Sequence, residues 1–416
     1  MTRRRTAAAS LTLLALLLPA PLAAAGTASA AGSPTADLSA EVSAESRRAA
    51  VHLARPTGPF AVGQDDLHLV DHSRTDPWAG SGPRELMVTL RYPARRDTGR
   101  TARYLTREEA RLLLVDRGLD QAIPAETLAG VATHARSGAR PAAGRYPLIV
   151  LSPGFTVPRA TLTSLAEDLA SRGYVVAAVD HAYESVGTAF PGGRVLTCLA
   201  CEKADQAGGT GAVAVTRARD VSFLLDRLTG PRAAWRHAGI IDAHRIAMAG
   251  HSLGGASAAT AMAADPRILA GVNMDGGFSA PVADAGLGGR PFMLLGAQAR
   301  RPGGNKSWDE TWPRLDGWKR WITFDGSGHF SFSDFPAIGE QLGLPDPEVP
   351  LPGGRSVELT RRYVGAFFDQ HLKGVPQPVL DGPSTDAPEA RFHTEVSQGV
   401  SQGTTVTGWR TTASKR

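Results

Sequence analysis

The chain has 416 residues, with 45 lysines and arginines, 40 aspartates and glutamates, and a net charge of +5. Arg3, Arg4 and Arg5 lie in an N-terminal segment without acidic residues, so the remainder has 42 basic and 40 acidic residues, a net charge of +2. With this balance, and with no long basic stripe interleaved with aromatic side chains, nucleic acid is not an expected partner. The length fits one large α/β domain with insertions.

Residues 1–30 have the features of a secretory signal peptide. The three arginines precede an apolar run at 11–25 and the small residues Ala28-Ser29-Ala30, which resemble a cleavage site. The apolar run is too short to span a bilayer, and no later stretch is long enough. The sequence therefore predicts a soluble, secreted protein, and both the general and the twin-arginine export routes are compatible with these residues.

The first part of the mature chain is predicted to contain few regular elements. Residues 31–60 are rich in Ala, Ser, Pro and Gly and are interpreted as a leader segment. Strands are expected at 66–70 and 85–92, the second ending at Pro93. Residues 96–144, with a helix at 107–117, are interpreted as a connection over one face of the sheet.

Strands and helices then alternate, which predicts a mostly parallel central sheet with helices on both faces. Strands are expected at 146–152, 174–179, 269–274, 291–296 and 318–324, and helices at 160–172, 217–228 and 357–372. The catalytic domain is assigned to residues 61–380. Residues 381–416, rich in Ser, Thr, Gly and Pro, are expected to form a flexible tail.

Residues 245–255 combine a short apolar strand, the motif Gly250-His251-Ser252-Leu253-Gly254, and the start of an Ala-rich helix. This is the context of a nucleophile elbow, in which a serine occupies a tight strand-to-helix turn and glycines two residues away allow the bend. The pattern predicts Ser252 as the nucleophile of an α/β-hydrolase fold.

A serine nucleophile needs a histidine base, and the histidine needs an acid. His329 follows the last predicted strand of the central sheet in a Gly/Ser loop, where this fold places its base. Asp275 ends the strand after the elbow helix and is predicted to be the acid, with Asp325 as the alternative. His251 cannot reach round to the neighbouring hydroxyl as a base, so a packing or supporting role is expected.

The oxyanion formed during acyl transfer needs preorganised amide donors. The residue after the nucleophile, Leu253, supplies one of them. The second is expected from the loop after the strand at 146–152, where Pro153 has no amide hydrogen and Phe155 is placed to donate.

Cys198 and Cys201 are the only cysteines, so a four-cysteine zinc site is excluded. A local disulfide in a surface loop is the better interpretation for an exported chain. His68 and His72 do not fall on a convincing helix, so metal binding at these two histidines is not expected.

Four stretches resemble the plasma-type platelet-activating factor acetylhydrolase family and its secreted bacterial lipase relatives, over about residues 60–375. They are VLSPGF at 150–155, LASRGYVVAAVDH at 169–181, GHSLGG at 250–255 and GSGHFSFSDF at 326–335. The resemblance implies Ser252, Asp275 and His329 as the catalytic residues, with the amides of Phe155 and Leu253 as oxyanion donors. One departure is Pro153-Gly154, where the family commonly has His-Gly.

The resemblance also implies hydrolysis of small-molecule or lipid carboxylic esters through an acyl-enzyme, without a cofactor. Five aromatic residues could either line an apolar binding site for the acyl group or pack in the core, and the sequence favours neither placement. They are Phe330, Phe332, Phe335, Trp308 and Trp312. No insertion resembles a lid, so short to medium acyl groups are expected. A cutinase-like polyester hydrolase is an alternative, and the intact Ser252, Asp275 and His329 argue against a non-catalytic binding protein.

Overall fold

The computed structural model describes residues 50–279 and 282–394. The predicted signal peptide, most of the predicted leader and the end of the predicted tail lie outside these residues. None of the described helices combines the length and the apolar character that crossing a membrane requires.

The described chain forms a sheet of 11 strands in the order β13-β12-β11-β10-β9-β5-β6-β2-β1-β4-β3. From β6 to β12 neighbouring strands are parallel, whereas β2 is antiparallel to β6 and β13 to β12. The strands are β1 (Ala61–Thr75), β2 (Pro83–Ala94), β3 (Arg100–Thr101), β4 (Arg136–Ser137), β5 (Tyr146–Ser152), β6 (Val175–His181), β9 (Ile241–His251), β10 (Ile268–Met274), β11 (Phe292–Ala297), β12 (Lys319–Phe324) and β13 (Ala390–His393). A separate short pair consists of β7 (Thr188–Ala189) and β8 (Val195–Leu196).

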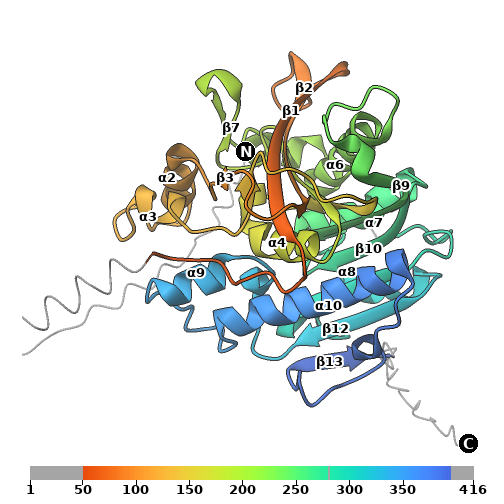
Figure 1. Ribbon diagram of the computed structural model, residues 1–416. Helices are drawn as coiled ribbons and strands as arrows, with labels where there is room; N and C mark the ends of the chain where they lie inside the picture. The colour runs from red at the N-terminus through yellow and green to blue at the C-terminus, as the bar shows by residue number, and fades with distance from the viewer. Residues whose placement is uncertain (1–49, 280–281, 395–416) are drawn as a thin grey trace, which may run out of the picture. The chain divides into compact units, whose positions relative to one another are not determined.

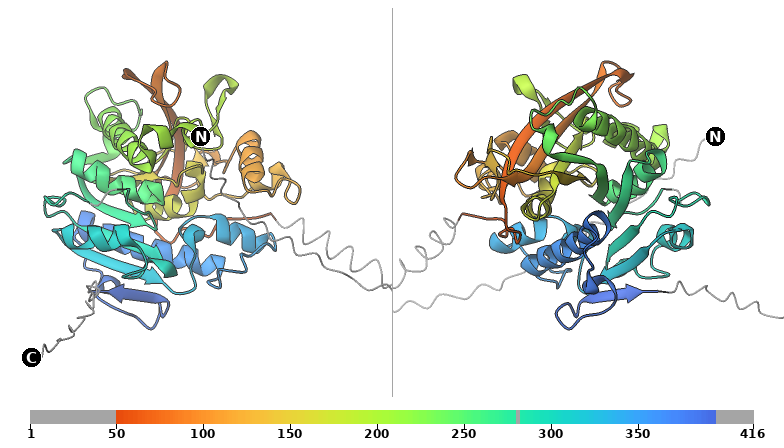
Figure 2. Two further views of the ribbon diagram at one scale, coloured as in Figure 1. Left: turned by 180° about the vertical axis from the view of Figure 1, so that it is seen from behind. Right: turned by 45° about the vertical axis from the view of Figure 1, so that its right-hand side comes forward.

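Helices cover both faces of this sheet, as predicted (Figures 1 and 2). The described helices are α2 (Arg107–Asp116), α3 (Ala125–Ala129), α4 (Thr163–Ser171), α5 (Ala200–Lys203), α6 (Gly209–Thr229), α7 (Leu253–Ala264), α8 (Lys306–Thr311), α9 (Phe335–Gln341) and α10 (Gly353–Lys373). Side chains of β5 alternate between two apolar cores because successive residues of a strand point to opposite faces. Leu148 and Val150 join α6 and α7 on one face, and Ile149 and Leu151 join α4 and α10 on the other.

The ends of the domain differ from the prediction. β13 lies inside the predicted flexible tail and pairs with β12, so the ordered domain extends past residue 380. Val51 and Leu53 of the predicted leader are buried. β2 continues through Pro93. Its pairing with β6 ends at Arg91, so the missing amide hydrogen of Pro93 costs no hydrogen bond to β6, and its carbonyl accepts a hydrogen bond from the amide of Ala142.

The segment at 96–144 also differs from the prediction. Instead of lying over one face of the sheet, α2 and α3 form a small apolar cluster of their own with the start of the described chain and with α9. Leu113, Leu114 and Leu128 are buried in this cluster together with Ile338. The segment therefore forms a wall beside the loop that carries His329.

Candidate active site

Ser252 occupies a sharp turn between β9 and α7. Its φ of 53° and ψ of −125° lie in a region that side-chain-bearing residues rarely adopt. A Cβ on Gly250 would lie 2.2 Å from the carbonyl carbon of Gly254, and one on Gly254 would lie 2.0 Å from the oxygen of Ser152. Both glycines are therefore required by close backbone contacts at the turn.

The structure brings together the three residues predicted as a catalytic triad. His329 Nε2 lies 3.0 Å from Ser252 Oγ, and His329 Nδ1 lies 2.5 Å from Asp275 Oδ2. Because a carboxylate can only accept, Nδ1 carries the proton and Nε2 is free to accept the serine proton. This is the geometry that general-base activation of a serine requires.

Asp275 is held in place independently of the histidine. It follows β10, is 2% exposed, and accepts hydrogen bonds through Oδ1 from the Ala297 amide at 2.8 Å and from Arg300 Nε at 3.3 Å. The alternative acid, Asp325, is turned elsewhere and is ion-paired with Arg391 of β13.

His251 supports the loop that carries His329. It is buried, its Nε2–H donates to the carbonyl of His329 at 2.8 Å, and its ring lies 4.7 Å from the His329 ring. Nδ1 has no hydrogen-bond partner among the described residues. Burial lowers the pKa of His251 to about 4, so it is neutral at pH 7.

The two predicted oxyanion donors lie in suitable segments. Leu253 is the first residue of α7. Neither its backbone amide nor that of Phe155 donates a hydrogen bond to another described residue. A Cβ on Gly154 would lie 3.3 Å from Ser252 Cβ, so the loop of Phe155 passes directly beside the serine. Both amides are free to donate to a substrate.

A buried polar network supports this loop, and the sequence reasoning missed it. Arg217 Nη1 donates to the Pro153 carbonyl at 2.5 Å and to Ser152 Oγ at 3.2 Å, while its Nε donates to Glu184 at 2.7 Å. Ser152 also bonds to His181, whose Nδ1 donates to Asp220 at 2.8 Å. One signal was available, since Arg217 lies on the apolar face of its helix, four residues before Val221.

An apolar cavity of about 940 Å³ lies beside His329. Phe330 and Phe335 line it, together with leucines of α2 and of the segment after α9. Phe332 and Trp308 are instead buried in the cores, and Trp312 packs against one of them. The five aromatic residues therefore divide between the cavity and the core.

A disulfide joins Cys198, which precedes α5, to Cys201 within that helix. Their separation of 3 residues makes it a local link. Within the residues that the structure describes, no group of three or more metal-ligating side chains is found.

Comparisons with known proteins agree on one family. The family model for platelet-activating factor acetylhydrolase, isoform II, matches residues 46–191 and 234–344. A probable 1-alkyl-2-acetylglycerophosphocholine esterase of Arthroderma benhamiae is 30% identical, over 82% of this chain and 93% of the relative. The platelet-activating factor acetylhydrolase of Gallus gallus is 23% identical, over 55% of this chain and 62% of the relative.

A solved structure is more similar in sequence. The ferulic acid esterase of Streptomyces cinnamoneus is 44% identical and superposes with a TM-score of 0.73, over 83% of this chain and all of the other. At 44% identity the two proteins are similar in sequence as well as in fold.

Arg217 is expected to be a positioning residue for the oxyanion loop. Arg217→Met should lower kcat by about tenfold or more with a smaller change in KM, because a displaced amide donor weakens transition-state binding. The substitution should also destabilise the fold by about 3–5 kcal/mol, since Glu184 loses a buried partner. Steady-state kinetics well below the melting temperature check the prediction.

The matched control for this variant is Arg219→Met, because Arg219 lies on the same helix but is exposed. It should behave as the wild type. A loss of stability in Arg217→Met with unchanged kcat would mean that Arg217 supports the fold alone.

His251 is expected to make stability depend on pH. Its pKa is lower in the folded than in the unfolded chain, so its contribution is constant above about pH 6.5 and falls as the pH drops toward 4. The loss should be about 2 kcal/mol at pH 5. The free energy of unfolding is measured by urea denaturation of wild type and His251→Gln at pH 7.5 and pH 5. If it falls by the same amount between the two pH values in both proteins, the prediction is wrong.

Proposed function

The chain belongs to the platelet-activating factor acetylhydrolase isoform II family and is a carboxylic ester hydrolase, and we propose that it cleaves its ester through an acyl-enzyme on Ser252. The hydrogen-bonded series Ser252–His329–Asp275 is the observation that carries this proposal. Ser252 Oγ attacks the ester carbonyl carbon while His329 Nε2 takes its proton. Asp275 keeps the imidazole oriented and stabilises its charged form.

The tetrahedral oxyanion receives hydrogen bonds from the amides of Leu253 and Phe155. When it collapses, the bond to the alcohol oxygen breaks and His329 returns its proton to that oxygen. Water, deprotonated by the same imidazole, then attacks the acyl-enzyme, and the carboxylic acid leaves as Ser252 regains its proton. No metal or organic cofactor takes part in these steps.

The apolar cavity beside His329 is proposed to hold an apolar group of the substrate. It is lined by Phe330, Phe335 and Leu119, among others, and is large enough for a medium-length chain or an aromatic ring. The proposed substrate is therefore a small-molecule or lipid ester that carries one apolar group. The aromatic lining and the 44% identity with a ferulic acid esterase favour aromatic acyl esters as a second candidate.

The protein is proposed to be exported. The arginines, apolar run and small residues of positions 1–30 support this, as does the disulfide between Cys198 and Cys201, because disulfides persist in oxidising compartments.

Hydrolysis of p-nitrophenyl esters of graded acyl length tests the nucleophile. Ser252→Ala should lower kcat by about 10⁴-fold or more, and activity should peak at short or medium chains. Equal rates in wild type and variant would refute the assignment. The same assay with methyl ferulate separates the aromatic acyl candidate from the alkyl one.

The two aspartates near the histidine make a matched pair. Asp275→Asn should lower kcat by about 10³–10⁴-fold because the imidazole loses its orientation, whereas Asp325→Asn should stay close to wild type. The reverse order of effects would reassign the acid.

A larger side chain in the cavity should alter the chain-length profile. Leu119→Trp is expected to lower kcat/KM for decanoate esters by about tenfold and to change the acetate value little, because the ring occupies space needed by the longer chain. Val115→Trp is the control, since Val115 is 49% exposed and does not line the cavity. An unchanged profile in Leu119→Trp would place the acyl group elsewhere.

A further inference from the structure

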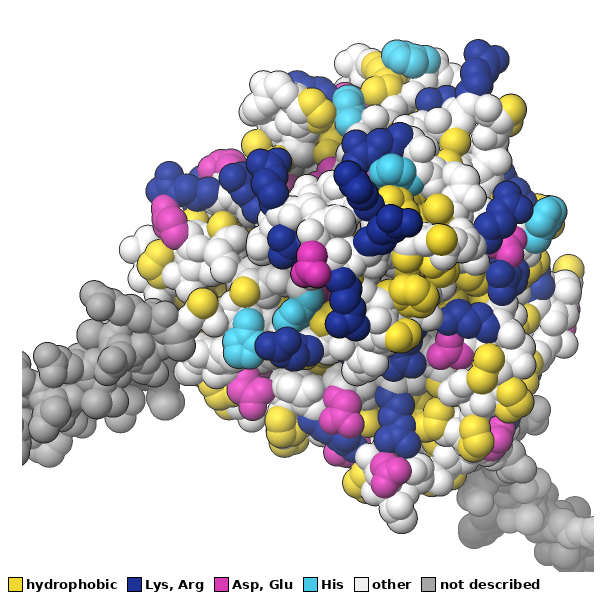
Figure 3. All heavy atoms as spheres, in the orientation of Figure 1, with side chains coloured by type: hydrophobic (Ala, Val, Ile, Leu, Met, Phe, Trp, Pro, Cys, Tyr) yellow, Lys and Arg dark blue, Asp and Glu magenta, His cyan; other side chains and the backbone are white. Residues whose placement is uncertain are grey.

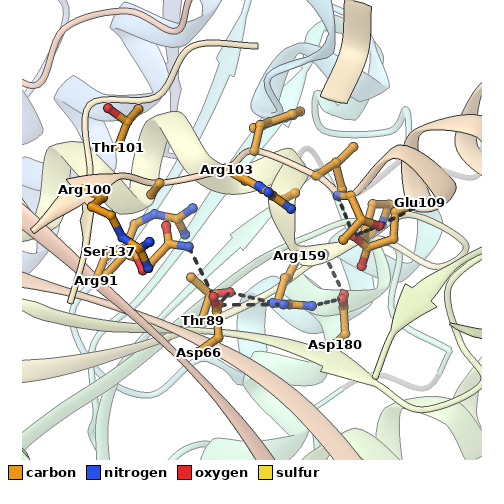
Figure 4. Close-up of a pocket in the computed structure, with 17 residues that line it drawn as sticks. Asp66, Thr89, Arg91, Arg100, Thr101, Arg103, Glu109, Ser137, Arg159 and Asp180 are labelled. Carbon is orange, nitrogen blue, oxygen red and sulfur yellow. Dashed lines mark hydrogen bonds and ion pairs between the residues drawn. The ribbon is translucent and has the colours of Figure 1, made fainter. Parts of the chain in front are cut away.

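A second cavity, of about 400 Å³, lies between the strands β1 and β2, the segment around β3 and residues 158–160 (Figure 4). Ser252, Asp275 and His329 are not among its lining residues, so it is separate from the proposed catalytic site. Four arginines line it: Arg91, Arg100, Arg103 and Arg159. Figure 3 shows Lys and Arg side chains over the part of this face that holds α2 and β3, as well as over other parts of it.

The carboxylates in this cavity already have partners. Asp180 accepts a hydrogen bond from the Arg159 amide at 2.6 Å and is ion-paired with the Arg159 side chain. Asp66 accepts from Thr89 Oγ1 at 2.5 Å, and its nearest cation is Arg159 at 3.9 Å. Figure 4 shows this chain of contacts along one side of the cavity.

Glu109 is also engaged, at the N-terminus of α2. It accepts hydrogen bonds from the amide and hydroxyl of Thr106 and from the amide of Ala189, at 2.7–2.9 Å. The acidic lining residues are thus committed to protein donors, and only Arg159 among the arginines is neutralised by them.

Arg91 provides the strongest indication of a ligand. It is 2% exposed, and only its Nη2 has a partner, Thr163 Oγ1 at 3.0 Å. Its Nε and Nη1 have no hydrogen-bond partner in the described part of the chain. A buried cation with two open donor atoms is unfavourable unless an anion meets it.

Two carboxylates near Arg91 but outside the cavity lining do not accept hydrogen bonds from its Nε or Nη1. Glu167 accepts from the amides of His134 and Ala135, and Asp334 accepts from the amides at the start of α4. Burial lowers the pKa of Arg91 although Glu167, Asp66 and Asp334 oppose this shift, so the charge of Arg91 is not fully compensated.

We propose that this cavity binds a phosphate-type oxyanion, with Arg91 at its base and the exposed Arg100 and Arg103 at its mouth. Neither exposed arginine forms an ion pair with any described carboxylate, so both are available. A tetrahedral oxyanion offers acceptors in several directions to guanidinium groups that approach from different strands, which a planar carboxylate does less well. Free phosphate and the phosphate group of a larger molecule share this chemistry.

Binding can be measured as a rise in melting temperature. Sodium phosphate is titrated at constant ionic strength into wild type, Arg91→Met, Arg103→Gln and the control Arg96→Gln, whose arginine lies on the same connection but outside the cavity. Wild type and Arg96→Gln should show a saturable rise. Arg103→Gln should bind about tenfold more weakly, and Arg91→Met should lose the saturable response.

Equal responses in all four proteins would show a general salt effect and overturn the proposal. Without phosphate, Arg91→Met should melt at or above the wild-type temperature, because an unpaired buried charge is removed. Should this variant fail to fold, the double variant Arg100→Gln/Arg103→Gln takes its place and must lose the response.

The source of the phosphate group is tested with glycerol 3-phosphate in the same assay. Tighter binding than orthophosphate identifies a phosphate ester as the ligand, and weaker binding identifies the free ion. A response to acetate equal to that of phosphate would overturn the tetrahedral preference. Ester hydrolysis by Arg103→Gln should match the wild type, so failure of this proposal is distinct from failure of the proposed catalytic function.

Discussion

A buried ion network around Asp220 fixes the positions of the elements on which the active site depends. Arg84 of β2 donates to Asp220 of α6 and to Glu184, which follows β6, and it is fully buried. Although burial opposes ionisation, Arg84 and the hydrogen bond from His181 hold the pKa of Asp220 well below its usual range. The network thus ties two strands and a helix together beneath the loop that carries Phe155.

Through Glu184 the same network reaches Arg217, and Arg217 holds the carbonyl of Pro153. This gives a physical role to the departure from the His-Gly pattern noted in the sequence. Pro153 has no amide hydrogen to donate, but its carbonyl is anchored, and Gly154 leaves room for the loop beside Ser252. Ser152, His181 and Asp220 repeat the residue types of a catalytic triad, yet all three are buried, so their role is to hold the loop.

The sequence was sufficient to predict the parallel sheet and the three residues that meet at its carboxyl edge. Apolar strands of five to seven residues and the glycines around Ser252 are local signals, and chain order then selects Asp275 and His329. The wall formed by α2 and α3 was not predicted, because its packing against α9 joins segments far apart in the chain. The Arg84–Asp220 pair spans 136 residues and has no periodic signature. The strand β13 was missed because it has only four residues and lies in a polar region that resembles a tail.

The two edges of the sheet bear on self-association of the protein through strand pairing. A strand at the edge of a sheet exposes unpaired amides and carbonyls that can recruit a strand from another chain. Here the described sheet ends in β13, of 4 residues, and in β3, of 2 residues. β13 covers four residues of β12, so that edge presents no long template for intermolecular pairing, and the six parallel strands that build the active site remain enclosed. At the other edge β4 pairs only with Gly63 and Gln64 of β1, so most of this 15-residue strand has no strand partner on its outer side among the described residues, and pairing between copies is expected there.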